Sequence, residues 1–333
     1  MTAGENAPIF STINFYKNKS HRLQAHLSQH PDDWPKFQPE FNQAIEDILK
    51  NMLKFEKENI GEFEWKVYKL KKIFEKRFRR YFLYGDYVRH SYQKPFGYPG
   101  DFKIIDDIYL NQPRTAGFER LWDACFQKLA AAEATRERKE DFKKIIYECA
   151  AQHKGREIRI MDLASGPARE IKELLDAYPA LFSKVIFDCY ELDDNAIAYA
   201  SRLLNNAPGV NFFKKNAIKL ALRKDISSEI PQKYDMIYST GLFDYLDERI
   251  AAKLISNLKN VLTSDGVMCI SNYADKYSNT SAYLMEWVAE WNLIYRTEDE
   301  FRQLFIDAGF TPSQLTIIPQ KSKVMQYCVA RAK

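Results

Sequence analysis

Hydrophobic residues recur at two different spacings along the chain, and the change of spacing divides it. Between residues 13 and 153 they recur every three or four positions, which is typical of amphipathic helices. From Glu157 onward, short apolar runs alternate with helical stretches. This alternation predicts a parallel sheet with helices on both faces. We therefore expect two domains, a helical one over residues 1–153 and an α/β one over residues 154–333.

The helical domain is expected to contain six helices. Residues up to Thr12 show no periodicity and are expected to be disordered or loosely attached to the surface. The helices are predicted over 13–28, 40–59, 62–84, 101–110, 115–133 and 135–153. The proline-containing run 31–39 separates the first two, and Asp101 and Thr135 are candidate N-caps.

Two features of this domain carry candidate functions. The third helix shows an apolar stripe surrounded by the basic residues Lys66, Lys69, Lys72, Lys76, Arg79 and Arg80. A solvated outer face explains such a pattern, and the alternative is a docking surface for an acidic partner such as RNA or an acyl carrier. Residues 84–101 hold four tyrosines, three glycines and two prolines without any helix or strand period. Long irregular loops of this kind are often functional, and their aromatic side chains can form pocket walls.

Composition narrows the class of protein. The 333 residues are 46% hydrophobic, which is ample for two cores, and the net charge of +4 does not indicate a nucleic-acid-binding protein. The five cysteines lie far apart without a Cys-x-x-Cys pair, so we expect reduced core residues, with neither disulfides nor a metal site. No apolar run is long enough to span a membrane, and the first residues lack a secretory signal, so a cytoplasmic location is expected.

The α/β domain is expected to contain seven strands. They are predicted over 158–162, 185–190, 210–213, 234–239, 267–271, 314–318 and 324–330. The intervening helices are predicted over 169–178, 194–206, 216–223, 248–262, 282–291 and 298–308. A link of only five residues joins the last two strands, so these must be antiparallel neighbours.

The turn after the first strand is the candidate ligand site. Small residues at Ala164, Gly166 and Ala168 let the backbone approach a ligand closely. The helix that opens at Pro167 to Arg169 directs its unpaired N–H groups to the same place. Strand, tight turn and helix together are typical of a nucleotide-binding site.

Residues 155–333 resemble the class I S-adenosylmethionine (SAM) dependent methyltransferases. The family turn reads Asp-x-Gly-x-Gly-x-Gly, and Asp162-Leu-Ala-Ser-Gly-Pro-Ala168 matches it with alanine in place of the first and third glycines. Because alanine disfavours positive φ, we expect right-handed or extended backbone at those two positions. The resemblance implies a Rossmann-like, seven-stranded, mostly parallel sheet with an antiparallel terminal strand, preceded by a helical lid domain. It also implies SAM as cofactor, held at this turn by Asp162, Ala164, Ser165, Gly166 and Arg169.

The resemblance extends to the ends of the later strands. Glu191 is expected to accept hydrogen bonds from the ribose hydroxyls, while Asp193 is either a fallback for this role or a helix cap. Leu192 is expected on an adenine face. Asn216, followed by Ala217, either binds the adenine amino group or only caps a helix. The methionine portion is expected to bind at Ser239, Thr240, Gly241 and Phe243, with Phe243 or Tyr245 covering the sulfonium by cation–π attraction.

A narrower resemblance covers nearly the whole chain. Segments 96–101, 130–138, 238–245, 271–273 and 286–297 resemble bacterial methyltransferases that form methyl esters of 3-hydroxy fatty acids such as 3-hydroxypalmitic acid. This resemblance implies a small-molecule acceptor with a carboxylate. All five histidines precede the α/β domain, which also favours an acceptor that is already anionic over one that must lose a proton.

Several residues are candidates for the acceptor side. Tyr98, Asp244 and Tyr273 are the candidate catalytic residues, and Tyr92, Tyr98, Tyr273 and Arg296 are the candidate acceptor contacts. A structural ion pair is the rival interpretation of Arg296. Two other functions stay open: intramolecular cyclisation of SAM to azetidine-2-carboxylate with release of methylthioadenosine, and methylation of nucleic acid. A small-molecule substrate is the expected partner, with an acyl carrier or a second copy of the chain as further candidates.

Overall fold

The computed structural model describes residues 7–153 and 155–333, and its chain divides into two units that interleave in sequence. The helical unit contains residues up to Glu133 together with Lys276–Asn292. The α/β unit contains Ala134–Asp275 and Leu293–Lys333. This division differs from the predicted boundary at residues 153 and 154, because nearly all of helix α7 (Ala130–Gln152) belongs to the α/β unit. The segment after the fifth strand returns to the helical unit, which local periodicity does not reveal.

The helical unit packs around aromatic side chains. Its helices are α1 (Ala7–Gln29), α2 (Trp34–Asn59), α3 (Glu64–Arg77), α4 (Asp86–Gln93), α5 (Phe102–Leu110), α6 (Gly117–Gln127) and α13 (Ser281–Tyr283), with a π-helix over Leu284–Val288 and 3₁₀ turns at Pro31–Asp33, Arg79–Tyr81 and Lys276–Ser278. Trp122 is fully buried and meets the rings of Tyr16 and Phe41 edge to face, at centroid distances of 6.1 and 5.3 Å. Such pairs add to the energy of area burial and fix how the helices pack.

Three predictions for this unit were wrong. Helix α1 already begins at Ala7 and buries Ile9, so residues 7–12 are not loosely attached, whereas residues 1–6 lie outside the described part of the chain. The loop predicted over 84–101 contains a helix, α4, which begins after Gly85 at φ 76°. Thr135 lies inside the continuous helix α7 and is not an N-cap.

Two local predictions for the same region were accurate or nearly so. Asp101 caps α5, since its carboxylate accepts hydrogen bonds from the backbone N–H groups of Lys103 and Ile104. Helix α2 begins six residues earlier than expected, at Trp34, because a proline is tolerated in the first turn, where its missing N–H would have no partner.

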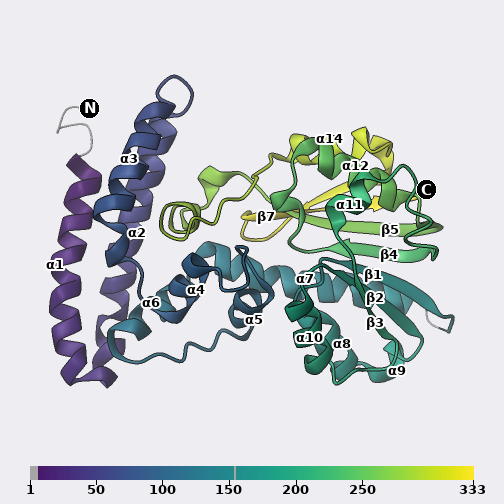
Figure 1. Ribbon diagram of the computed structural model, residues 1–333, viewed down its shortest axis with the longest axis horizontal. Helices are drawn as coiled ribbons and strands as arrows, with labels where there is room; N and C mark the ends of the chain where they lie inside the picture. Colours follow the sequence, from purple (N-terminus) through teal and green to yellow (C-terminus); the bar gives the residue numbers. More distant parts are fainter. Residues whose placement is uncertain (1–6, 154) are drawn as a thin grey trace. The chain divides into compact units, whose positions relative to one another are not determined.

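The α/β unit is a single seven-stranded sheet covered by helices on both faces. Its strands are β1 (Ile158–Leu163), β2 (Val185–Glu191), β3 (Val210–Lys214), β4 (Tyr234–Ser239), β5 (Leu262–Tyr273), β6 (Leu315–Pro319) and β7 (Met325–Arg331). Beside α7 its helices are α8 (Arg169–Ala177), α9 (Pro179–Phe182), α10 (Asp194–Leu203), α11 (Ala217–Leu222), α12 (Glu248–Lys259) and α14 (Glu298–Asp307), with 3₁₀ turns at Phe243–Tyr245 and Pro312–Gln314. Figure 1 shows α8, α9 and α10 on one face of the sheet and α11, α12 and α14 on the other.

The strand order is β3-β2-β1-β4-β5-β7-β6. All neighbouring pairs from β3 to β5 are parallel, and β7 is antiparallel to both β5 and β6. The predicted seven-stranded, mostly parallel sheet with an antiparallel last strand is confirmed, as is the antiparallel β6–β7 pair. The direction of winding reverses between β1 and β4. In open α/β sheets, ligands bind at the carboxyl ends of the strands beside such a reversal.

The central strands of the sheet unit lie in its core. The central strands β1 and β4 are buried along their length apart from Arg159, as expected for strands with both faces covered. All five cysteines are buried free thiols. Among residues 7–153 and 155–333, none of the helices combines the length and the apolar character needed to cross a bilayer.

Candidate functional site

The turn after β1 has an unusual backbone. Ala164, Gly166 and Ala168 all have positive φ, at 58°, 52° and 50°. The expectation of right-handed or extended backbone at the two alanines was therefore wrong. A left-handed alanine costs roughly 1 kcal/mol, and neighbouring contacts offset this cost. The Ala164 N–H donates to the Tyr190 carbonyl at 2.7 Å, and the Ala168 N–H donates to the Ser165 carbonyl at 3.0 Å.

This turn combines open space at Gly166 with nearby buried polar atoms that have no partners within the described chain. A Cβ added to Gly166 would meet nothing within 4 Å. Beside it, the hydroxyl of Ser165 and both carboxylate oxygens of Asp162 are buried and accept no hydrogen bond of normal geometry from the described residues. Buried polar atoms almost always have partners, so orphaned ones next to open space indicate a ligand that supplies them.

Three carboxyl groups gather at this edge of the sheet, from Asp162, Glu170 and Glu191. The hydroxyl of Tyr238 donates to Glu170 at 3.2 Å and also lies near Asp162. Burial raises the pKa of Asp162 well above its usual range, and the neighbouring charge of Glu170 raises it further. Burial also raises the pKa of Glu170. A cationic group of a ligand would relieve the repulsion between these acids, so the cluster suits a positively charged ligand.

Glu191 at the end of β2 is held in place by backbone N–H groups. One carboxylate oxygen accepts from Gly166 at 2.9 Å, and the other accepts from Leu192 at 2.6 Å and Asp193 at 3.0 Å. The carboxylate is thus oriented before any ligand arrives and retains lone pairs for hydroxyl donors. Asp193 caps α10 through the Asn195 N–H at 2.8 Å, which agrees with the second of its two predicted roles.

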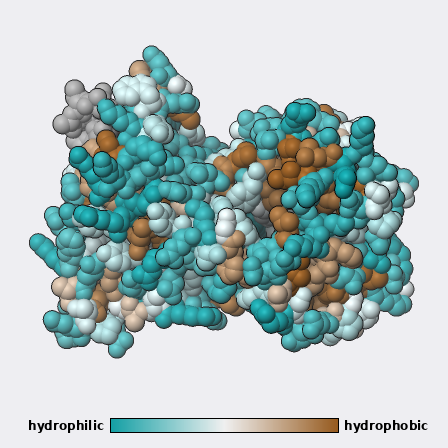
Figure 2. All heavy atoms as spheres, viewed as in Figure 1, coloured by the Kyte–Doolittle hydropathy of each residue, from teal (hydrophilic) through white to brown (hydrophobic). Residues whose placement is uncertain are grey.

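Apolar side chains stay exposed next to Glu191. Leu192 is 53% exposed and Ile218, at the start of α11, is 47% exposed. Figure 2 shows hydrophobic side chains gathered on the visible face of the α/β unit among hydrophilic ones. Asn216 caps α11 by accepting from the Lys219 N–H at 3.1 Å, and Ala217 opens that helix. Exposed apolar side chains at this edge of the sheet suit the flat face of an aromatic base.

Hydrogen bonds to other parts of the chain hold the loop after β4 in place. The Ser239 hydroxyl donates to the Leu163 carbonyl at 2.8 Å, which ties β4 to β1, and the Ser271 hydroxyl donates to the Thr240 carbonyl at 2.5 Å. Phe243 is fully buried in the hydrophobic core, so the prediction that it covers a sulfonium was wrong. Tyr245, which is 38% exposed, is the remaining aromatic residue of the predicted pair.

Asp244 is the acid of this loop. Its carboxylate accepts from the Tyr273 N–H at 2.7 Å, and its carbonyl accepts from the Ile294 N–H at 2.7 Å. Burial raises its pKa to about 6, although the nearby cations of Arg138 and Arg296 favour the charged form. Burial likewise raises the pKa of Tyr273 to about 12. Asp244 is therefore able to exchange a proton near neutral pH, whereas the Tyr273 phenol stays protonated.

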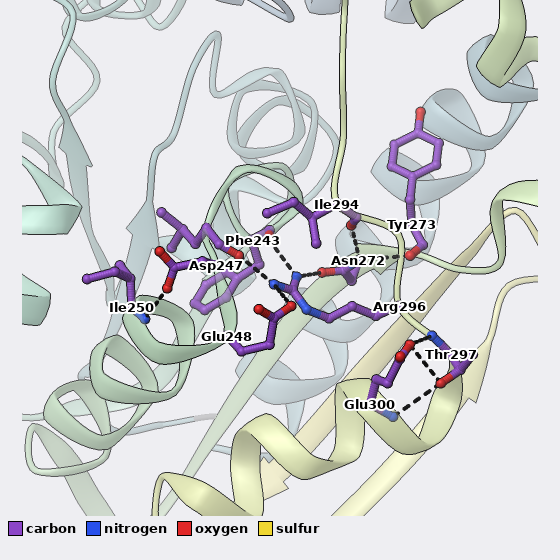
Figure 3. A network of polar contacts seen from close by, with 11 residues as sticks. Phe243, Asp247, Glu248, Ile250, Asn272, Tyr273, Ile294, Arg296, Thr297 and Glu300 are labelled. Atoms are coloured by element: carbon purple, nitrogen blue, oxygen red, sulfur yellow. Dashed lines mark hydrogen bonds and ion pairs between the residues drawn. The ribbon is translucent and has the colours of Figure 1, made fainter. Parts of the chain in front are cut away.

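Arg296 belongs to the structure of this loop. Its guanidinium donates to the Phe243 carbonyl at 2.9 Å, to Asn272 Oδ1 at 2.6 Å and to the Leu246 carbonyl at 2.5 Å (Figure 3). The side chain is 1% exposed. Arg296 also pairs with Glu248 at 3.5 Å, so the geometry favours the rival interpretation, a structural ion pair, over a contact with the acceptor.

Arg138 was not among the predicted site residues, yet it lies at this edge. It projects from α7, and the terminal atoms of its guanidinium lie 3.6 to 3.7 Å from where a Cβ on Gly241 would be. Its charge acts on Asp244, Tyr273 and Glu170. The only sequence signal was the resemblance of segment 130–138 to bacterial methyltransferases that form fatty acid methyl esters. Helical periodicity does not distinguish Arg138 from the other charged residues of this helix.

The remaining predicted residues belong to the helical unit. Tyr92 lies under the guanidinium of Arg79, whose carbon is 5.4 Å from the ring centroid. Arg79 itself is buried and pairs with Glu290 at 2.5 Å, so it is not part of an exposed basic face. His90 pairs with Asp101 at 2.7 Å. The roles of Tyr92 and Tyr98 toward an acceptor remain predictions. Within the described part of the chain, acidic, histidine and cysteine side chains form no group of three that would hold a metal ion.

Comparison with known proteins supports the fold. No protein family model matches the chain, and no curated protein matches it either. Among solved structures it is similar to a possible exported protein from Bordetella parapertussis, with a TM-score of 0.54 and 20% identity over 69% of this chain and 79% of that one.

Two further solved structures are more distant. Magnesium protoporphyrin IX methyltransferase (ChlM) from Synechocystis PCC 6803 with bound SAH has a TM-score of 0.44 and 14% identity, covering 59% of this chain and 84% of that one. PigF with SAH has a TM-score of 0.44 and 16% identity, covering 74% of this chain and 67% of that one. With TM-scores under 0.5, these two add nothing to the site. The strand order is that of a Rossmann-like, mostly parallel sheet with an antiparallel last strand, and the similarity to the Bordetella structure supports this fold.

Proposed function

We propose that this protein is a SAM-dependent methyltransferase that acts on a small molecule. The observation that carries the proposal is the turn after β1, where polar atoms of Asp162 and Ser165 are buried without partners among the described residues and Gly166, which has open space at its Cβ position, donates to the oriented carboxylate of Glu191. SAM carries two positive charges, on its ammonium and its sulfonium, and two ribose hydroxyls. A cluster of buried acids next to a carboxylate with free lone pairs is complementary to those groups.

Different residues of the chain would bind different parts of the cofactor. Glu191 accepts from the ribose hydroxyls, Leu192 and Ile218 cover the adenine, and Asp162 with Ser165 binds the ammonium end. Arg169 opens α8 beside the same turn, and the N–H groups in the first turn of that helix would face the ligand. When bound, SAM supplies an electrophilic methyl group that an oxygen nucleophile can attack in line. Orientation and removal of water supply most of the rate in such a displacement.

The acceptor we propose is a carboxylate, with a 3-hydroxy fatty acid as the first compound to test. This assignment depends on the sequence resemblance of segments such as 96–101 and 286–297 and on the lack of histidine at this edge of the sheet. A carboxylate is ionised at neutral pH, so it needs orientation and not a base. Asp244 would take up a proton only if the nucleophile were a hydroxyl.

We further propose that the helical unit acts as a lid. Its loop between α4 and α5, residues 94–101, holds Tyr98 between Gly97 and Gly100, both with positive φ. Glycines of this kind give a loop hinge points, and exclusion of water favours displacement chemistry. Hydrogen exchange of residues 84–101 should slow when SAM is added, and Tyr98→Ala should lower turnover. Unchanged exchange together with full activity of the variant would contradict the lid.

One experiment tests the proposed function directly. The protein is incubated with SAM and 3-hydroxyhexadecanoate, and the sulfur-containing product and any methyl ester are identified by mass spectrometry. We expect S-adenosylhomocysteine and the ester in equal amounts, with no product from Gly166→Val. Formation of methylthioadenosine would instead indicate cyclisation of SAM, and failure of the protein to bind SAM in calorimetry would contradict the proposal altogether.

A further inference from the structure

Four large apolar side chains are exposed where α2 joins α3 in the helical unit. Ile60, Phe63, Trp65 and Tyr68, here called the apolar tip, are each between 38% and 66% exposed. They lie in the connection and in the first two turns of α3, and Figure 1 shows this connection at the free end of the two helices. Single exposed apolar residues are common, but four within nine residues of one hairpin indicate an interaction site.

The same helix carries positive charge on its exposed face. Residues 65–80 contain eight lysines and arginines and one acidic residue, whereas the rest of the chain has more acidic than basic residues. The exposed residues of α3 that share one face, at positions i, i+3, i+4, i+7 and i+11, are Trp65, Tyr68, Lys69, Lys72 and Lys76. The three lysines, here called the basic stripe, therefore continue the face on which the apolar tip ends.

The order of the two groups along the helix indicates which kind of partner fits. The apolar tip comes first and the basic stripe follows. Proteins that bind single-stranded nucleic acid stack its bases on aromatic rings along a positively charged groove, and an aliphatic side chain such as Ile60 cannot contribute to stacking. At a bilayer surface, tryptophan and tyrosine prefer the headgroup level, and lysines lie next to the lipid phosphates. The separation of apolar and basic groups therefore favours a bilayer over nucleic acid.

Two acidic residues determine where the attraction comes from. Glu62 and Glu64 are exposed beside the apolar tip, so the tip itself is not strongly cationic. Attraction to an anionic surface depends on the basic stripe, in which each lysine contributes roughly fivefold to affinity near anionic lipids. Lipid composition should therefore decide whether the apolar tip inserts.

We propose that the apolar tip and the basic stripe bind the surface of a bilayer that contains anionic phospholipids. Helix α3 lies in the plane of that surface, because only this orientation brings Trp65 to the headgroup level and Lys76 to the lipid phosphates together. The inference does not depend on the proposed function, since binding to a bilayer requires no SAM. A long-chain acid, the acceptor proposed above, would partition into the same bilayer.

The test measures how much of the full chain sediments with vesicles. Vesicles of phosphatidylcholine and phosphatidylglycerol in equal parts are compared with vesicles of phosphatidylcholine alone. We expect roughly tenfold or greater preference for the anionic vesicles. The preference should disappear at high salt, because the Debye length falls from about 10 Å at 0.1 M to about 3 Å at 1 M.

Substitution of two lysines of the basic stripe should remove most of this preference. Lys69→Gln/Lys76→Gln should weaken binding to anionic vesicles by roughly tenfold or more. The matched control is Lys36→Gln/Lys144→Gln, which removes the same charge from two exposed positions, one near the start of α2 and one in α7. The control should bind like the wild-type chain. Circular dichroism of both variants checks that the helices are intact.

Tryptophan fluorescence gives a second measurement. In the described part of the chain Trp122, Trp287 and Trp291 are buried and Trp34 is half-buried, so Trp65 is the exposed tryptophan. Brominated phosphatidylglycerol should quench the fluorescence of the wild-type chain. Trp65→Phe should still bind these vesicles but lose most of the quenching.

Single substitutions separate insertion from charge. Trp65→Ala should weaken vesicle binding by roughly fivefold, whereas Phe15→Ala, which removes an exposed aromatic ring from α1, should not. Glu62→Gln/Glu64→Gln should strengthen binding to anionic vesicles, because it removes two repelling charges.

Three results would overturn the inference. The first is absence of vesicle binding, or equal binding to both vesicle types. The second is equal behaviour of Lys69→Gln/Lys76→Gln and its control. The third is displacement of the chain from vesicles by a single-stranded RNA or an acidic acyl carrier that requires the same lysines, since the surface would then serve that partner. Calorimetry with SAM distinguishes these results from failure of the proposed function, because a chain that binds SAM but no vesicles refutes only the bilayer surface.

Discussion

The turn after β1 and the loop after β4 lie at the same edge of one sheet, yet they are built in opposite ways. The first is open and has backbone in a costly conformation, with the carboxyl of Asp162 buried and without a partner. The second is closed by its own chain, with Arg296 bound to the carbonyls of Phe243 and Leu246 (Figure 3). The difference fits the proposed function, in which the first turn would bind the cofactor and the second loop would hold Asp244 in position.

Removing the support of the second loop should have the largest effect. Arg296→Ala leaves two backbone carbonyls and the Asn272 oxygen buried without their donor. Loss of one partner from a buried charged network costs about 3–5 kcal/mol. Urea denaturation should show this loss of stability in Arg296→Ala. Arg302→Ala, which removes a 30% exposed arginine from a surface ion pair in α14, should change stability by under about 1 kcal/mol. Equal effects of the two substitutions would mean that the network does not support the loop.

The buried acid of the same loop should make stability depend on pH. Because the pKa of Asp244 is raised from 3.8 to about 6 in the folded chain, the native state binds its proton more tightly than the unfolded state. Stability should therefore fall as pH rises from about 4 to about 6, by on the order of 3 kcal/mol for a shift of this size. Asp244→Asn removes this contribution while its amide oxygen can still accept from the Tyr273 N–H.

Asp162 and Glu170 also have raised pKa values, so the measured quantity is the difference between wild type and Asp244→Asn at each pH. That difference should change across pH 4 to 6 and be constant above pH 7. A constant difference throughout would show that Asp244 is charged in the folded chain at all these values.

A larger side chain at Gly166 tests whether the turn after β1 binds a ligand. Gly166→Val introduces a branched side chain where φ is 52° and where the proposed ligand lies. We expect SAM affinity to fall at least a hundredfold, which corresponds to about 2.7 kcal/mol, while circular dichroism changes little. Gly309→Val serves as control, since Gly309 has φ 92° in the same unit but follows α14. Normal SAM binding by Gly166→Val would show the turn to be an ordinary connection.

We expect the smallest effect on SAM affinity from a substitution of Glu191, whose carboxylate is oriented by backbone N–H groups. Glu191→Gln removes the charge that the ribose hydroxyls would bind and places an amide among three backbone donors. Weakening of SAM by roughly thirtyfold is expected, or about 2 kcal/mol. Asp194→Asn, a nearby exposed position with a side chain 71% exposed, should leave calorimetric affinity unchanged. If Glu191→Gln binds SAM as tightly as wild type, the ribose contact lies elsewhere.

Local patterns predicted most of the fold of the α/β unit. Apolar runs such as those of β1 and β4 mark buried strands, and the five-residue link between β6 and β7 leaves only an antiparallel pairing. Chain order alone also placed Glu191 and Asp162 at neighbouring strand ends, because parallel strands end at one edge. The helical unit was predicted less well. Helix α4 begins after a glycine, and α2 contains prolines, a residue type that usually interrupts a helix.

The structure agrees with the expected positions of the strand-end residues, and it differs from the sequence-based expectation where a side chain's place depends on packing. Phe243 and Arg296 both follow strand ends and were reasonable candidates, yet one is in the core and the other is bound to carbonyls. Sequence separation hides these partners, since Arg296 lies about fifty residues from the carbonyls it binds. Arg138 was missed for the same reason, because the residue that it meets, Gly241, lies in another part of the chain.

The sequence by itself determined the alternation of strands and helices, the strand ends that carry Asp162 and Glu191, and the small residues of the turn between them. These depend on spacing and side-chain size, which are local properties. Only the tertiary structure decided that Ala164 and Ala168 have positive φ, because contacts such as that of the Ala164 N–H with Tyr190 offset the local cost. It also decided which arginine is structural and which lies at the ligand edge, because that depends on which distant groups surround each guanidinium.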